Sequence, residues 1–186
     1  MLRRSLLAIG LATPTLTWSQ DELLPRLQAG GCVVAFRHAL APGTYDPPNF
    51  RLGDCSTQRN LSDEGRVQAR RIGEWFRARQ FLPVRVRSSP WCRCVDTAQL
   101  AFGTAEPWAA LGSPRAGTES TNDRSLAELR AALADAGRQR GRFEVWVSHM
   151  FVLNDLTSAS TASGEGLLLD LAPDGAPRVL ARLVVA

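Results

Sequence analysis

The stretch CVVAFRHALAPG, residues 32–43, combines an apolar run with an adjacent arginine and histidine. Its first five residues are almost all apolar, and such an uninterrupted run is typical of a strand in a sheet covered on both faces. The run ends in Arg37 and His38, and His38 is one of only two histidines in the chain. A fixed positive charge next to an imidazole disfavours its protonated form. The stretch therefore predicts a buried strand that ends in a guanidinium and a neutral histidine.

Further strands alternate with helices on either side of this stretch. Residues 82–89 (LPVRVRSS) and 143–149 (FEVWVSH) have strand-like patterns, and residues 166–186 read as two strands joined by a turn at Asp174 and Gly175. Helices are expected at residues 19–29, 61–80 and 124–137 and directly after Ser89 and Pro90, and residues 39–60 and 103–122 are expected to be loops. This alternation predicts one α/β domain, residues 20–186, with three layers and a mainly parallel sheet flanked by helices.

The clearest helix is LSDEGRVQARRIGEWFRARQ, residues 61–80. Ser62 is placed to cap its start, and the acidic residues that follow suit the positive end of a helix dipole. The apolar residues expected to face the core are Val67, Ile72, Trp75 and Phe76.

Three of the predicted strands end in residues of similar chemistry. The first runs into Arg37 and His38, and the third runs into Ser148 and His149. The second runs into SSPWCRC, which places Arg93 near the start of the next helix. Ligands of open α/β sheets bind beyond the carboxyl ends of the strands, and a helix N-terminus favours an anion. Both histidines and two arginines are thus expected around a phosphate or carboxylate.

The N-terminal segment MLRRSLLAIGLATPTLTWSQ has the pattern of a secretory signal peptide. It combines a basic start with an apolar run too short to span a bilayer, and small residues Thr17 and Ser19 precede an expected cut before Gln20. Removing residues 1–19 leaves 20 arginines against 18 acidic residues, a net charge of +2. This charge is too small to favour nucleic-acid binding. We therefore expect export to the periplasm or beyond, without stable membrane insertion.

Export makes disulfide bonds the expected role of the four cysteines. Cys92 and Cys94 flank Arg93 and are poorly placed to pair with each other, whereas a bridge from Cys55 to either one would tie the 39–60 loop to the predicted site. Cys32 is the fourth, and the spacing alone does not choose among the pairings. No other Cys or His lies at zinc-ligand spacing, so disulfides are favoured over metal.

Taken together, four segments resemble the histidine phosphatase superfamily, and its phosphoglycerate-mutase-like branch most closely. They are FRHA, LSDEGRVQARRIGEWF, RSSPWCRCVDTAQLAFG and VSHMFVLNDLTS, and the resemblance spans about residues 31–157. The chain departs from the family pattern at Ala39 and Met150, where the family usually has glycine after each histidine. The long proline-containing loop and the export signal are similar to exported members.

The resemblance implies a metal-independent phosphatase that hydrolyses phosphomonoesters and needs no cofactor. His38 matches the nucleophile that takes up the phosphoryl group, and Arg37 and Arg93 match the residues that bind its oxygens. His149 matches the second histidine, which donates to the same oxygens. The proton for the leaving group is expected from Asp123 or Glu119, and an N-cap role for Asp123 is an equal alternative.

Other polar residues near the predicted site have simpler interpretations. Ser88 and Ser89 are interpreted as helix caps, Trp91 and Trp108 as packing residues, and Asp46 and Asp54 as turn residues. Arg59 and Asn60 are candidates for the rim of the phosphate site.

Two functions from other classes are also consistent with the sequence. One is a catalytically weak or inactive module of the same fold that binds phosphate or another anion. The second is a thiol–disulfide protein built on Cys92 and Cys94. A small phosphorylated molecule is the expected partner of the phosphatase, and the sequence indicates neither its identity nor an oligomeric state.

Overall fold

Six strands form a single mixed sheet in the computed structural model, which describes residues 20–113 and 121–185. The strands are β1 (Cys32–Arg37), β2 (Arg85–Ser88), β3 (Glu106–Pro107), β4 (Phe143–Ser148), β5 (Gly166–Leu171) and β6 (Pro177–Leu183). The helices are α1 (Gln20–Ala29), α2 (Asp63–Ala78), α3 (Cys92–Phe102), α4 (Asp123–Gly137) and α5 (Met150–Thr157), with short 3₁₀ turns at η1 (Cys55–Thr57) and η2 (Ala109–Leu111). The expected signal peptide, residues 1–19, lies outside the described residues.

The strand order is β3-β2-β4-β1-β5-β6. The pairs β3–β2, β2–β4 and β4–β1 are parallel, while β5 and β6 form an antiparallel hairpin that adds to β1. The buried strand β1 is therefore central, with β4 on one side and β5 on the other. This arrangement confirms the predicted three-layer, mainly parallel α/β fold, including the C-terminal hairpin.

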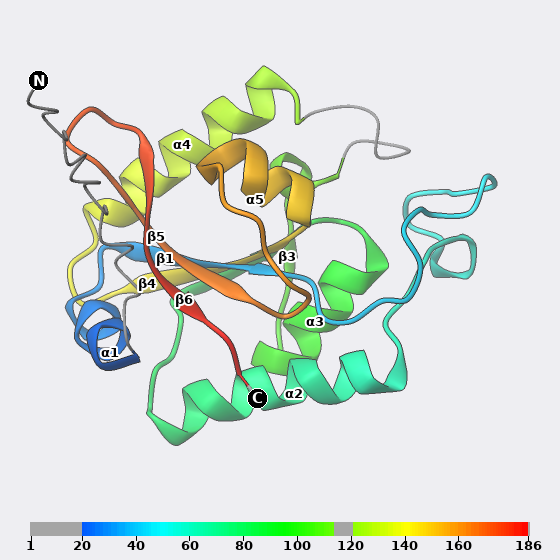
Figure 1. Ribbon diagram of the computed structural model, residues 1–186, viewed down its shortest axis with the longest axis horizontal. Coiled ribbons are helices and arrows are strands. Elements are labelled where there is room, and N and C mark those ends of the chain that lie inside the picture. The colour runs from blue at the N-terminus through cyan, green and yellow to red at the C-terminus, as the bar shows by residue number, and fades with distance from the viewer. Residues whose placement is uncertain (1–19, 114–120, 186) are drawn as a thin grey trace, which may run out of the picture.

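Helices cover both faces of the sheet (Figure 1). One face packs against α1, α2 and α3 through a cluster that includes Val34, Phe36 and Phe76. The opposite face packs against α4, α5 and η2 through a cluster that includes Trp146, Leu129 and Leu153. Alternate residues of β1 enter the two clusters, because successive side chains of a strand point to opposite faces.

Helix α2 begins as predicted, since the Ser62 hydroxyl accepts a hydrogen bond from the Gly65 amide at 3.1 Å. Its core face differs from the prediction, because Val67 is 44% exposed. Small residues occupy the closest contact instead: a Cβ at Gly73 would lie 2.0 Å from the carbonyl oxygen of Ala101 in α3. Residue 73 must therefore be glycine for the two helices to pack this closely.

The segment after α3 is expected from its sequence to be a loop, but part of it pairs with the sheet. Glu106 and Pro107 pair with the end of β2, and η2 follows directly. No helix within residues 20–113 and 121–185 is both long and apolar enough to cross a membrane.

Candidate active site

The two histidines lie side by side at the carboxyl edge of the sheet. Strands β1 and β4 are parallel neighbours, and their last residues, Arg37 and Ser148, lie opposite each other. The residue that follows each strand is a histidine. The His38 amide donates to the Ser148 carbonyl at 2.9 Å. The imidazole centroids of His38 and His149 are 5.5 Å apart, with the rings inclined at 70°. The parallel register thus brings together two residues that are 111 positions apart.

His38 is held as one particular neutral tautomer. Its side chain is buried, and Nδ1 lies 2.8 Å from the carbonyl oxygen of Ala39. A carbonyl oxygen can only accept, so Nδ1 carries the proton and Nε2 carries the free lone pair. The pKa of His38 is lowered to about 3. Burial is the largest cause, the charges of the three arginines add to it, and the hydrogen bond to Ala39 opposes it in part. Burial therefore contributes more to the neutral state than the adjacent Arg37 does.

His149 is also buried and has a fixed orientation. Its Nε2 lies 2.8 Å from the Ser89 hydroxyl, and Arg93 Nη2 lies 3.5 Å from its Nδ1. A guanidinium only donates, so Nδ1 accepts and Nε2–H donates to Ser89. Burial and the charge of Arg93 lower the pKa of His149 well below its ordinary value. Ser89, interpreted above as a helix cap, instead orients this imidazole.

Arg93 lies in the first turn of α3 and is only 4% exposed. Its Nη1 donates to Asp46 Oδ1 at 2.8 Å, while Nη2 faces His149. Its Nε is buried and has no hydrogen-bond partner among the described residues. The guanidinium is therefore fixed along one edge and retains an unsatisfied donor.

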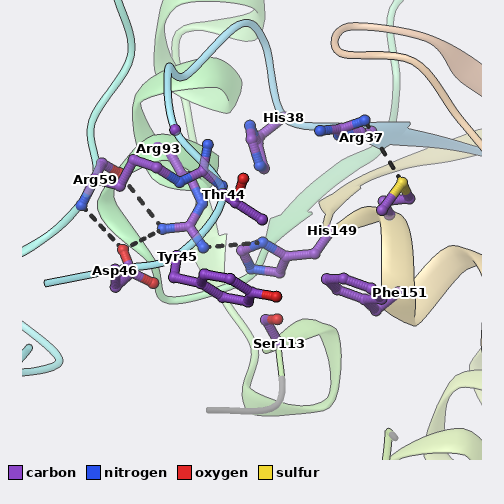
Figure 2. Close-up of a pocket in the computed structure, with 12 residues that line it drawn as sticks. Arg37, His38, Thr44, Tyr45, Asp46, Arg59, Arg93, Ser113, His149 and Phe151 are labelled. Carbon is purple, nitrogen blue, oxygen red and sulfur yellow. Dashed lines mark hydrogen bonds and ion pairs between the residues drawn. The ribbon is translucent and has the colours of Figure 1, made fainter. Parts of the chain in front are cut away.

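Arg37 and Arg59 complete a cluster of three arginines (Figure 2). Arg37 Nη1 donates to the Thr161 carbonyl at 2.9 Å and lies 3.8 Å from the Met150 sulfur. Arg59 donates to the Ala41 carbonyl, so the residue expected at the rim does reach the site. The Nε of each is buried without a partner among the described residues. Unsatisfied donors on converging cations are suited to an oxyanion.

Asp46 is part of this cluster, although the sequence suggested only a turn. Its Oδ1 accepts from the Arg59 amide at 2.9 Å and from Arg93 Nη1, and Oδ2 accepts from Trp91 Nε1 at 3.2 Å. This carboxylate holds the 39–60 loop against α3. Asp54, by contrast, has the expected turn role, since it accepts from the Ser56 amide.

The arginines and histidines surround a cavity of about 150 Å³. Its wall is made by Arg37, His38, Gly43, Thr44, Tyr45, Asp46, Arg59, Arg93, Ser113, His149, Met150 and Phe151. The volume fits a phosphate group together with the first atoms of whatever it esterifies. Within the described part of the chain, no group of three or more His, Cys, Asp or Glu side chains is arranged to hold a metal ion.

A disulfide links Cys55 to Cys92, one of the two pairings left open by the sequence. It joins the 39–60 loop to the residue before Arg93, and the Cys92 amide also donates to Gln58 at 3.0 Å. Cys32 and Cys94 are free and buried, and burial raises the pKa of each thiol to about 12. Cys92 and Cys94 are thus not partners, which disfavours a dithiol redox function.

The structure does not bring Asp123 into the cavity. Asp123 is the first residue of α4 and is exposed, and Asn122 rather than Asp123 caps this helix by accepting from the Ser125 amide. Glu119 lies outside the described residues. Asn60 donates to the Cys55 carbonyl and does not line the cavity. The two tryptophans pack as expected: Trp91 against Phe50 and His149, and Trp108 against Trp146.

The sequence did not single out three of the residues that line the cavity. Asp46, Tyr45 and Phe151 line the cavity, yet the first two lie in a loop without periodicity, and Phe151 follows the second histidine inside a helix. The one available signal was the length of the 39–60 segment, since long loops in compact domains are often functional.

Comparison with known proteins agrees with this architecture. Residues 37–111 match the model of the histidine phosphatase superfamily (branch 1), which confirms the resemblance found in the sequence. None of the curated sequences compared with the chain matches it. The protein histidine phosphatase SixA complexed with tungstate has 17% identity and a TM-score of 0.56, over 82% of this chain and 96% of SixA. Phosphoserine phosphatase from Entamoeba histolytica with 3-phosphoglyceric acid has 13% identity and a TM-score of 0.56 (82% and 96% covered). Rv3214 from Mycobacterium tuberculosis has 15% identity and a TM-score of 0.56 (83% and 96% covered).

Proposed function

We propose that this member of the histidine phosphatase superfamily is a metal-independent phosphatase that hydrolyses phosphomonoesters through a phosphohistidine on His38. The observation that carries the proposal is the tautomer of His38. Its Nδ1 is committed to the Ala39 carbonyl, so the lone pair of Nε2 is available in a cavity lined by three arginines. A neutral nucleophile beside converging cations is the arrangement that phosphoryl transfer to histidine requires.

In the first step, His38 Nε2 attacks phosphorus. The N–P bond forms as the bond from phosphorus to the leaving oxygen breaks, and that oxygen takes a proton from water to leave as an alcohol or phenol. Arg37, Arg59 and Arg93 donate to the non-bridging oxygens, where negative charge accumulates. His149 lines the same cavity, where its Nδ1 accepts from Arg93 Nη2 and so helps to orient that guanidinium. Removing one preorganised donor of this kind slows a reaction by roughly 100- to 1000-fold.

In the second step, water attacks the phosphohistidine. The new O–P bond forms, the N–P bond breaks, and inorganic phosphate leaves while His38 returns to its neutral form. Among the described residues, the cavity wall offers no carboxyl proton donor for the first step, because Asp46, its one carboxylate, accepts three hydrogen bonds. Substrates whose leaving groups need little protonation are therefore expected to react fastest.

The test is the isolation of the phosphoenzyme. Wild-type protein incubated with a ³²P-labelled phosphomonoester and quenched in alkali should carry a label that is stable in base and lost in acid, the behaviour of phosphohistidine. His38→Ala should carry none and should not turn over 4-nitrophenyl phosphate. His149→Ala should still be labelled on His38, but slowly, so the pair of variants separates the nucleophile from the second histidine.

Inhibition by vanadate separates catalysis from simple binding. Vanadate mimics the pentacoordinate transition state, so it should inhibit hydrolysis of 4-nitrophenyl phosphate. Protein that binds vanadate or phosphate but forms neither label nor product between pH 4 and 8 would instead be the anion-binding module considered above. Labelling of a folded His38→Ala variant would refute the mechanism.

We also propose that residues 1–19 direct export and that the mature domain begins at Gln20. The Cys55–Cys92 disulfide supports this, because disulfides persist in oxidising compartments such as the periplasm. Fractionation of the expressing cell, with N-terminal sequencing of the product, tests both statements. Uncleaved protein in the cytoplasm would refute them.

A further inference from the structure

Two exposed aromatic side chains line the cavity that holds the arginines. Tyr45 is 61% exposed and Phe151 is 38% exposed. Figure 2 shows both rings on the same side of the cavity, near His149. Eight large hydrophobic residues are exposed within the described parts of the chain, and these two are the only aromatic ones among them. Single exposed apolar residues are common on protein surfaces, but the gathering of both aromatic ones at one cavity indicates a binding function.

The two rings are not part of the hydrophobic packing. Neither contacts another aromatic ring among the described residues, whereas Phe50 and Trp91, from the same region, stack on each other at 5.5 Å. An aromatic face left accessible next to a polar site is available to a ligand, and such contacts favour offset-stacked or edge-to-face rings.

The positions of both rings are fixed by residues of the phosphate site. Tyr45 precedes Asp46, whose carboxylate is bound to Arg93. Phe151 is the second residue of α5 and lies two positions after His149, which caps that helix. Their distance from the phosphate position is therefore set by the same contacts that arrange the arginines.

The remaining outer wall carries no charge among the residues described. It consists of Gly43, Thr44, Ser113 and Met150. The charged members of the wall are Arg37, Arg59, Arg93 and Asp46, and all four are buried or half-buried. A substrate with a second carboxylate or phosphate next to its ester would meet no countercharge from these four residues.

We propose that Tyr45 and Phe151 form the binding site for the organic group of the substrate, and that this group is aromatic and uncharged where it joins the phosphate. The inference rests on the proposed function and narrows its substrate class to aryl or arylmethyl phosphates. For aryl phosphates it also agrees with the chemistry of the site, since a phenolate leaves with little need of the carboxyl proton donor that the described wall does not offer.

Phosphonates test this class without any chemical step, because their carbon–phosphorus bond is not cleaved by this mechanism. Inhibition constants of phenylphosphonate, cyclohexylphosphonate and methylphosphonate are measured against 4-nitrophenyl phosphate, or dissociation constants by calorimetry if turnover is absent. Phenylphosphonate should bind the wild-type protein best. Tyr45→Ala and Phe151→Ala should each weaken it roughly 2- to 10-fold, the range expected for one aromatic contact.

Two controls isolate the aromatic contribution. Methylphosphonate and vanadate should bind these variants as they bind the wild type, which shows that the arginine cluster is intact. Leu52→Ala serves as the matched control, because Leu52 is an exposed apolar residue of the same loop that does not line the cavity. Phe151→Leu keeps an apolar side chain and should still lose most of the phenyl preference.

The outcomes distinguish this inference from the proposed function. Equal binding of phenyl- and methylphosphonate by an active enzyme would overturn the aromatic site and leave the phosphatase standing. Equal binding of cyclohexyl- and phenylphosphonate would replace an aromatic class with a merely apolar one and so refute the proposal. A phenyl preference that depends on both rings, in a protein without turnover, would support the site while refuting catalysis.

Discussion

Asp46 and Arg93 are 47 residues apart in the chain, and Asp46 Oδ1 lies 2.8 Å from Arg93 Nη1. The pair is largely buried, and the same carboxylate also accepts from the Arg59 amide and from Trp91 Nε1. Breaking one side of a buried ion pair leaves the other charge uncompensated. We therefore infer that Asp46 is a positioning residue, which holds Arg93 in the orientation that the proposed phosphate site needs.

Replacing Asp46 should impair catalysis by displacing Arg93. Asp46→Ala removes three hydrogen bonds, and a misplacement of about 1 Å can slow an enzyme ~100-fold. We expect kcat/KM to fall roughly 10- to 100-fold in Asp46→Ala and less in Asp46→Asn, which keeps an acceptor. Steady-state kinetics with 4-nitrophenyl phosphate, and vanadate inhibition of the same variants, measure the effect. A wild-type kcat/KM in Asp46→Ala would mean that Arg93 is held by the remaining contacts alone.

Removing the Cys55–Cys92 disulfide should lower both stability and activity. The bridge closes a loop across a sequence separation of 37. The chain-entropy model gives about 4 kcal/mol for a loop of that length, as an upper estimate. Urea unfolding of Cys55→Ala/Cys92→Ala against the wild type measures the loss, and kcat/KM should fall because the bridge anchors the loop that carries Asp46 and Arg59.

A reductant provides the internal control for this bridge. Dithiothreitol should lower the stability of the wild-type protein towards that of the double variant, and it should not affect the double variant itself. Sensitivity of the double variant to reductant would assign the effect to another process. Cys32 and Cys94 should resist alkylation in the native state, since burial raises the pKa of both thiols to about 12.

The central part of the site was predictable because it depends on strand order and not on side-chain detail. Parallel strands end at the same edge of a sheet, so an apolar run followed by Arg37 and His38, and another followed by His149, are sufficient to place these residues together. Arg93 follows the same logic through the helix after β2. The register Arg37 to Ser148 then sets the histidine separation, which no sequence pattern fixes.

The contacts of the loop could not be predicted, because they have no local pattern. Asp46 reaches Arg93 across most of the 39–60 loop and α2, and nothing near Asp46 in sequence distinguishes it from a turn aspartate. The disulfide partner was ambiguous for a similar reason, since Cys92 and Cys94 differ by only half a helical turn. The error at Val67 has another cause: hydrophobic periodicity detects large side chains, whereas α2 packs closely through Gly65, Ala69 and Gly73.

Stability should fall as the pH drops below neutrality, because both histidines are neutral in the folded protein. An unfolded histidine has a pKa near 6.5, while that of His38 is lowered to about 3 and that of His149 well below its ordinary value. Between pH 6.5 and about 3 the unfolded chain therefore binds protons that the native protein does not, so the contribution is lost as the pH falls. The loss from pH 7.5 to 5.5 is about 1.4 kcal/mol for each histidine.

Urea unfolding across this range measures the effect, since the two histidines are the only side chains of the chain with an ordinary pKa near 6.5. His149→Gln should reduce the pH dependence by about half, whatever it does to the absolute stability. A free energy of unfolding that stays constant between pH 7.5 and 5.5 would show that the native histidines can be protonated, contrary to their burial.

Asp123 is a residue that the family pattern suggests as a proton donor, but the fold does not place it at the cavity. Asp123→Asn should leave kcat/KM unchanged, because the side chain is exposed at the start of α4 and does not line the cavity, and because Asn122 supplies the helix cap. The measurement should include a phenyl phosphate and an alkyl phosphate, since only the alkoxide needs a strong proton donor. A loss of roughly 100-fold confined to the alkyl phosphate would identify Asp123 as the general acid and would require α4 to move towards His38 during turnover. Wild-type kcat/KM values in Asp123→Asn with both substrates would exclude Asp123 as the general acid, and the aryl phosphate should then be the better substrate of the two.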